Sequence, residues 1–143
     1  MTAARILDDK GATVFTLRPS QTMHEAAVAL TEYKVGAVIV TDGQDHPVGV
    51  FSERDLARAI AGSGPAALSE RVDTVMSTKL ITATPADDID TLLSLMTEKR
   101  IRHIIIMDDQ RMVGVVSIGD VVKRKIAYAE AEAESLKAYI EGA

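Results

Sequence analysis

The sequence contains no cysteine among its 143 residues. A disulfide framework, a thiolate metal site, a cysteine nucleophile and thiol redox chemistry are therefore excluded. Tryptophan is also absent, and aromatic residues make up only 3% of the chain. So few rings could hardly supply a platform for stacked nucleic-acid bases. The core must instead be built from Val, Ile, Leu, Ala and Met, which dominate the 47% of hydrophobic residues.

Long apolar runs and an excess of positive charge are also missing. The chain contains no run of about eighteen apolar residues, the length needed to cross a membrane. Met1–Gly11 lacks the apolar region and cleavage site of a signal peptide. Twenty-one acidic against sixteen basic residues give a net charge of −5, which repels a phosphate backbone unless the charges are segregated. We therefore expect a cytoplasmic protein that binds neither membranes nor nucleic acid.

The chain contains an internal repeat. Val14–Leu56 aligns with Leu80–Val121 across a single one-residue gap, and turn residues, apolar runs and polar positions match together. The matched pairs include Thr16 with Thr82, Pro19 with Pro85, Gly49 with Gly114, Ser52 with Ser117 and Asp55 with Asp120. A repeat of this kind is one structural unit used twice.

Each repeat predicts the order strand, helix, strand, strand, helix. An extended segment ends before a proline, a helix with apolar residues three and four apart follows, and two short strands then form a hairpin across a polar turn. The second helix begins at Ser52–Asp55 or Ser117–Asp120. The expected strands are Val14–Leu17, Val38–Val40 and Val48–Phe51, then Leu80–Thr84, Ile104–Ile106 and Val113–Val116, and the expected N-caps of the first helices are Ser20 and Asp87.

The segment Ala61–Leu68 separates the repeats and contains two glycines and a proline. It includes a formal G-x-G-x-x-A pattern, but a dinucleotide-binding loop would need a strand before it and a helix directly after it. Here a predicted helix precedes the pattern and a proline interrupts it. We therefore interpret the segment as a flexible connection.

No catalytic constellation is recognisable. His24, His46 and His103 lack the spacing of metal ligands, and neither a phosphate-binding P-loop nor a nucleophile elbow occurs. The sequence therefore predicts neither an enzyme nor a metal site.

The shared segment G-x-x-S-x-x-D, at Gly49–Asp55 and Gly114–Asp120, carries the chemistry of the chain. Each glycine permits a close approach at a strand end, and each serine and aspartate stand at a helix N-terminus. One interpretation is helix capping, in which Ser or Asp satisfies free N–H groups. The other adds a ligand, because a helix N-terminus suits a phosphate and a carboxylate can accept both hydroxyls of a ribose. Repetition of the segment favours the ligand.

These features resemble the cystathionine-β-synthase (CBS) domain. The resemblance rests on the βαββα repeat, the T-x-x-P segment and the G-h-h-S-x-x-D segment, and it covers about residues 6 to 126. The lead-in RVDTVMSTKLITATP resembles the opening of a CBS repeat, and SERD together with a later RH is similar to small stand-alone bacterial CBS-pair proteins. Two such repeats form a Bateman module.

The resemblance implies a mixed α/β fold of two βαββα repeats related by a pseudo-twofold axis. The repeats would occupy residues 5–62 and 69–128, with a C-terminal helix at 129–143. It also implies a regulatory sensor that binds an adenosine nucleotide (AMP, ATP or NAD) and signals to an unknown effector protein, without a catalytic cofactor. A structural or protein-interaction module with vestigial clefts stays open as the alternative.

The family further implies two nucleotide clefts between the repeats. One would place Ser117 and Asp120 at phosphate and ribose, with Thr16, Gly36 and Ala37 at the adenine; the other would use Ser52, Asp55 and Thr82. Phosphate contacts are implied for Arg102, His103, Arg54 and Lys10. Arg54 is matched by Gly119, and Gly36 is matched by Arg102. Because a charge-assisted hydrogen bond contributes ~1.5–3 kcal/mol, we expect the two clefts to bind nucleotide with unequal affinities. We expect replacement of Asp55 to weaken binding more than replacement of Asp120.

The C-terminal segment has apolar residues spaced alternately four and three apart: Val122, Ile126, Ala129, Ala133, Leu136 and Ile140. This is an a/d pattern of under three heptads. Basic residues come first and acidic ones later, which opposes the helix dipole, so such a helix gains its stability from packing. It either lies on its own module or forms a dimer interface. We favour the interface, because Bateman modules commonly pair, and expect a homodimer.

Overall fold

The computed structural model describes residues 1–142, which form two compact units. The first unit contains Thr13–Ile81 together with Asp109–Val113, and the second contains Met1–Ala12, Thr82–Asp108 and the chain from Gly114 onward. Each unit is therefore centred on one repeat and includes the segment that precedes the other repeat in the chain.

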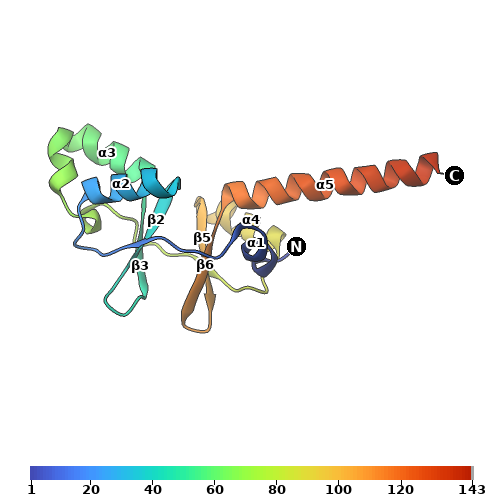
Figure 1. The fold of residues 1–143 in the computed structure, drawn as a ribbon, viewed down its shortest axis with the longest axis horizontal. Coiled ribbons are helices and arrows are strands. Elements are labelled where there is room, and N and C mark those ends of the chain that lie inside the picture. The colour runs from blue at the N-terminus through green and yellow to red at the C-terminus, as the bar shows by residue number, and fades with distance from the viewer. Residues whose placement is uncertain (143) are drawn as a thin grey trace. The chain divides into compact units, whose positions relative to one another are not determined.

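The first unit is a three-stranded sheet with two helices. Strand β1 (Thr16–Leu17) lies parallel to β2 (Ala37–Thr41), which pairs antiparallel with β3 (Pro47–Ser52), in the order β1-β2-β3. Helix α2 (Met23–Tyr33) connects β1 to β2, and α3 (Glu53–Ser63) follows β3 (Figure 1).

The second repeat has the same arrangement. Strands β4 (Thr82–Ala83), β5 (His103–Asp108) and β6 (Arg111–Ser117) form a sheet in the order β4-β5-β6, with β4 parallel to β5. Helix α4 (Ile89–Lys99) connects β4 to β5, and α5 (Ile118–Glu141) follows β6 (Figure 1). The predicted mixed α/β fold and βαββα order are confirmed in both repeats.

Both cores are built from aliphatic side chains on the middle strand and on the helix before it. In the first unit Val38 and Val40 of β2 belong to one buried cluster with Met23 of α2 and Phe51 of β3. In the second unit Ile104–Ile106 of β5 are at most 1% exposed. The β-branched runs of the sequence are therefore buried strands, as predicted.

The predicted N-caps of the first helices are wrong. Thr22 caps α2, where its hydroxyl accepts the Glu25 N–H at 3.2 Å, and Asp88 caps α4. The side chains just before these caps have another role. Gln21 accepts the Arg18 N–H and Asp87 accepts the Thr84 N–H, each at 2.8 Å. These bonds close the turn after each short strand and move each helix start further along the chain than predicted.

The predicted flexible connection is ordered. Helix α3 continues to Ser63, and a 3₁₀ helix, η1 (Gly64–Ser69), follows it directly. A second 3₁₀ helix, η2 (Val72–Thr74), comes three residues later. Ala67 and Val72 are both fully buried in the core cluster of the first unit, so burial of apolar side chains fixes the connection.

Each unit also receives a lead-in segment at the start of its first helix. Thr2, which caps helix α1 (Ala3–Lys10), forms an isolated antiparallel bridge with Asp88 in the second unit. Arg71, just before η2, forms the matching bridge with Thr22 in the first unit. Packing thus groups α1 with the second repeat, although α1 precedes the first repeat in the chain.

Helix α5 is 24 residues long and continues in one piece to the C-terminal end (Figure 1). Only Val121 on this helix is buried, and every residue from Lys125 to Gly142 is exposed. The C-terminal extension predicted at residue 129 is therefore a continuation of the second helix of the repeat. Within residues 1–142, no helix combines the length and the apolar character needed to cross a membrane.

Candidate functional site

The Ser–Asp pairs form reciprocal capping boxes at the starts of α3 and α5. At α3 the Ser52 N–H donates to Asp55 Oδ2 at 2.8 Å, and the Asp55 N–H donates to Ser52 Oγ at 3.3 Å. At α5 the same two bonds join Ser117 and Asp120 at 2.8 and 3.1 Å. The capping interpretation is therefore realised in both repeats, with serine at the N-cap and aspartate three residues later.

Capping leaves one oxygen of each carboxylate free. The serine groups donate to Oδ2, and within residues 1–142 no hydrogen bond reaches Oδ1 of Asp55 or of Asp120. Both side chains are partly buried and lie at the N-terminus of a helix, where the helix dipole favours negative charge. Each carboxylate can thus cap its helix and accept a hydrogen bond from a ligand, so the two interpretations are compatible.

Side chains of the lead-in segments explain why glycine occupies the first position of the shared G-x-x-S-x-x-D segment. A Cβ placed on Gly114 would lie 2.6 Å from a methyl carbon of Leu7, on α1. A Cβ placed on Gly49 would lie 2.4 Å from the sulfur of Met76. The close approach expected from the sequence therefore occurs in both repeats, and its partner is a hydrophobic side chain of the lead-in.

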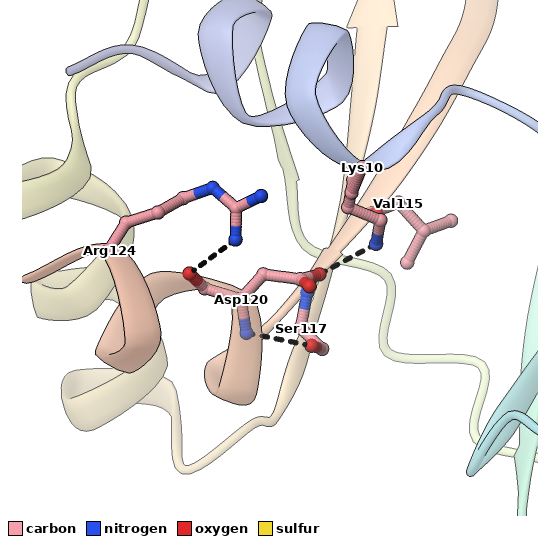
Figure 2. Close-up of polar contacts among 5 residues, drawn as sticks. All are labelled: Lys10, Val115, Ser117, Asp120 and Arg124. Atoms are coloured by element: carbon pink, nitrogen blue, oxygen red, sulfur yellow. Dashed lines mark hydrogen bonds and ion pairs between the residues drawn. The ribbon is translucent and has the colours of Figure 1, made fainter. Parts of the chain in front are cut away.

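Lys10 makes the start of α5 chemically different from that of α3. Its Nζ lies 2.6 Å from Asp120 Oδ2 and donates to the Val115 carbonyl at 2.8 Å (Figure 2). Among the described residues, no lysine or arginine forms an ion pair with Asp55. Arg54, for which the family resemblance implies a phosphate contact, is exposed on the first turn of α3.

Arg124 adds a second cationic group beside Asp120. Its Nη1 donates to the Asp120 carbonyl at 3.2 Å, one turn along α5 (Figure 2). Its Nε is buried and has no hydrogen-bond partner within residues 1–142. A buried donor without a partner costs ~1–3 kcal/mol, so an acceptor oxygen supplied at this place would be stabilising.

The charges near Lys10 also shift two pKa values. Burial raises the pKa of Asp120, but the Lys10 ammonium and the Ser117 amide outweigh it and hold that pKa below its usual value. Burial lowers the pKa of His103, Lys10 and Arg102 lower it further, and Asp120 acts in the opposite direction. Folded His103 therefore binds a proton less readily than the unfolded chain does, and acidification through about pH 6.5 should destabilise the fold.

We expect the pKa of His103 to move in opposite directions in two variants. Lys10→Met removes a nearby positive charge and should raise it, whereas Asp120→Asn removes a nearby negative charge and should lower it further. Titration of the His103 imidazole signals by NMR measures both shifts. Shifts of the same sign in the two variants would contradict this account of the site.

The remaining predicted residues lie at the strand ends beside the helix starts. Ala37 pairs with Ser52 in the sheet, and the carbonyl of the preceding Gly36 accepts the Glu53 N–H at 3.0 Å. In the second unit the Arg102 carbonyl accepts the Ile118 N–H at 2.8 Å. The exposed threonines are on the outer strands, where Thr16 pairs with Ile39 and Thr82 pairs with Ile105.

The twelve predicted residues thus fall equally into the two units. Thr16, Gly36, Ala37, Ser52, Arg54 and Asp55 are in the first unit, and Lys10, Thr82, Arg102, His103, Ser117 and Asp120 are in the second. The predicted combination of Ser117 and Asp120 with Thr16, and of Asp55 with Thr82, joins residues of different units and stays a prediction.

One groove of the first unit is lined by Gly36, a predicted nucleotide-binding residue, but it is not the predicted nucleotide cleft. It lies between α2 and α3, has a volume of about 630 Å³, and is lined by Gly36, Glu53 and mostly apolar side chains. Ser52, Arg54 and Asp55 are not part of its wall. The carboxylate of Glu53 lies at Gly36, where a Cβ would approach Oε1 to 3.0 Å. Lys34 also lines the groove with the opposite charge, so its charged lining does not favour an anion.

The sequence predictions did not include Arg124, which lies beside Asp120. A signal for it was present, because Arg124 follows Asp120 by four residues on a predicted helix, and residues four apart lie on the same face. Among the described residues there is no cluster of three or more His, Cys, Asp or Glu side chains able to hold a metal ion.

Comparison with known sequences identifies the same repeats. The family model described as CBS domain matches residues 12–62 and again residues 72–126. Over 125 residues the chain is 39% identical to the mitochondrial CBS domain-containing protein CBSX3 of Arabidopsis thaliana. That match covers 85% of this chain and 61% of the plant protein, so the chain spans about three fifths of its relative's length.

Two solved structures are similar over most of the chain. The CBS-domain containing protein ATU1752 from Agrobacterium tumefaciens has a TM-score of 0.83 and 39% identity, with 87% of this chain and 92% of that chain covered. The CBS domain protein PAE2072 from Pyrobaculum aerophilum, solved in complex with AMP, has a TM-score of 0.75 and 27% identity, with 84% and 89% covered.

Proposed function

This chain belongs to the CBS-domain family and carries two copies of the domain, and from this premise we propose that it is a regulatory module that binds an adenosine nucleotide. The observation that carries the proposal is the free Oδ1 of Asp55 and of Asp120 beside a helix N-terminus. The AMP complex of the similar PAE2072 protein supports adenosine as the ligand class.

In this proposal each residue type has one role. The free oxygen of Asp55 or Asp120 accepts a hydrogen bond from a ribose hydroxyl, and a phosphate lies at the positive end of the α3 or α5 dipole. Lys10 already forms an ion pair with Asp120. A phosphate bound there could therefore contact the Lys10 ammonium, but a ribose would compete with Lys10 for the Asp120 carboxylate. Asp55 has no such competitor, and we propose it as the stronger ribose site. AMP, ATP and NAD are the candidate ligands.

The module with bound nucleotide would act on an effector protein, and it would do so as a homodimer without catalysing a reaction.

The second candidate is a protein-interaction module whose clefts no longer bind nucleotide. The observation that favours it is that both capping boxes are complete without a ligand. Mass spectrometry of nucleotide released from the purified, denatured protein, followed by isothermal titration with AMP, ATP and NAD, separates the two. A protein that carries and binds no nucleotide would support the second candidate.

Adenine nucleotides should raise the melting temperature of the chain. A ligand that binds only the folded state, at one hundred times its dissociation constant, stabilises that state by ~2.7 kcal/mol. For a chain of this size the melting temperature should rise by roughly 4–10 °C. Differential scanning calorimetry with AMP, UMP and CMP measures the effect. Equal shifts with all three nucleotides would mean that the protein does not recognise the base.

A further inference from the structure

The C-terminal part of α5 presents an apolar stripe that nothing in the described chain covers. Ile126, Leu136 and Ile140 are 54%, 61% and 65% exposed, and Val122 is 42% exposed. Their spacing of three and four residues places them on one face of the helix together with Ala129 and Ala133. Large side chains thus stand at both ends of the stripe and two alanines at its middle.

The stripe follows the heptad of a two-stranded coiled coil. With Ile126 at position a, the other a positions are Ala133 and Ile140, and the d positions are Val122, Ala129 and Leu136. Isoleucine at a combined with leucine at d favours two parallel strands over higher assemblies. The alanines at the middle permit close approach of two backbones.

The flanking charges select the same orientation. In a parallel in-register pair, each g residue faces the e residue five positions later on the other helix. Glu132 (g) then faces Lys137 (e) of the second copy, and Lys125 (g) faces Glu130 (e). Every pair is attractive and occurs twice by symmetry. Because Lys125 also binds Asp90 of its own chain at 2.5 Å, the Glu132–Lys137 pairs carry most of this argument.

An antiparallel arrangement of the same stripe is disfavoured by charge. Placing Ile126 opposite Leu136 and Ala129 opposite Ala133 also matches large with large and small with small. However, e residues then face e residues and g residues face g residues, which brings Lys123 to Lys137, Glu130 to Glu130 and Glu132 to Glu132. These like-charge contacts repel.

We propose that the apolar face of α5 binds the same face of a second copy of this chain, as a parallel in-register coiled coil. The interface specifies one relative orientation of two identical chains through its e and g charges. It goes beyond the proposed nucleotide binding and does not depend on it, because every residue in it lies beyond Asp120. A coiled coil of under three heptads is short, so the tests use the full chain.

Cysteine cross-linking measures the orientation directly, since the chain has no cysteine of its own. Ala129→Cys and Ala133→Cys each place the thiol opposite itself in a parallel in-register pair, at a separation that a disulfide can span. Each variant alone should therefore form a covalent dimer under mild oxidation. Ala131→Cys, on the opposite face of α5, is the matched control and should stay uncross-linked.

Charge exchange tests the proposed specificity. Lys137→Glu turns both Glu132–Lys137 pairs into repulsive ones, and Glu132→Lys does the same with opposite sign. Each should weaken the dimer roughly tenfold, or about 1.4 kcal/mol. The double variant Glu132→Lys/Lys137→Glu should recover the parental affinity. Residues five apart are not neighbours on one helix, so recovery reports a contact between helices. Circular dichroism verifies that α5 stays helical.

Analytical ultracentrifugation supplies the deciding mass. The parent chain of 15.3 kDa should sediment as a dimer at micromolar concentration, with or without AMP. A monomer, or cross-links that form mainly between Ala129→Cys and Ala133→Cys chains when the two are mixed, would overturn the proposal. So would a dimer indifferent to both single charge changes. A monomer that sediments with phosphatidylglycerol-containing vesicles would assign the stripe to a membrane surface instead.

Discussion

The Asp55→Asn variant should bind AMP roughly 10- to 100-fold more weakly than the parent chain. Asparagine keeps an oxygen that can accept the Ser52 N–H, so the capping box survives. The group that would face the ribose becomes an NH₂ donor where the ligand hydroxyl also donates. Loss of the carboxylate charge at the helix N-terminus should cost only ~0.3–1 kcal/mol of stability. Isothermal titration therefore separates a large binding effect from a small folding effect.

Two further variants show whether the effect is specific to the shared segment. Asp88→Asn changes an aspartate that caps α4 outside that segment, and it should leave AMP affinity unchanged because Asn caps as well as Asp. Asp120→Asn should weaken binding less than Asp55→Asn, since Lys10 already occupies one oxygen of Asp120. If both Asp55→Asn and Asp120→Asn bind AMP, ATP and NAD as the parent does, the ribose role of these aspartates is wrong.

Replacing Gly114 with alanine should destabilise the chain by ~1–3 kcal/mol, the usual cost of overpacking a core. The new Cβ would lie 2.6 and 2.8 Å from the two methyl carbons of Leu7, whose side chain is only 7% exposed. Such a loss is a large share of the 5–15 kcal/mol that typical domains possess. Urea unfolding monitored by circular dichroism measures it.

Gly49→Ala is the matched control for Gly114→Ala. Its Cβ would approach the sulfur of Met76, which is partly exposed and belongs to a flexible side chain that can move away. Its cost should therefore be smaller. In a Leu7→Ala background the Gly114→Ala change should cost little, because the atoms that it meets are gone. An undiminished cost in that background would show that Leu7 is not the obstacle.

The elements that could be predicted from the sequence are those with a local cause. The period of the apolar residues and the proline turns placed both βαββα units, and the repeated Ser–Asp spacing placed the starts of α3 and α5. The cap of α4 was misplaced because Asp87 accepts the Thr84 amide instead, and the cap of α2 is Thr22 rather than the predicted Ser20. Propensity alone does not show which of several polar side chains takes the cap.

The contact between Lys10 and Asp120 illustrates what local patterns cannot predict. The two residues are 110 positions apart, and no periodicity connects them. Their pairing depends on α1 packing in the second unit, which the order of the repeats in the sequence does not suggest. The burial of Ala67 and Val72 could not be predicted locally either. Glycines and a proline predicted a flexible connection, but tertiary contacts bury its apolar side chains and order it.

The placement of α1 in the second unit has a consequence for how the chain folds during synthesis. Domains form from the N-terminus as the ribosome releases them, and most of the first unit is contiguous in sequence. Helix α1 is translated before it, yet its partners at the start of α4, in β6 and at the start of α5 emerge many residues later. Ile6 and Leu7, buried in the folded structure, therefore stay in contact with water while the first unit assembles, and a helix translated before the first unit docks after it. Closing so long a loop is slow.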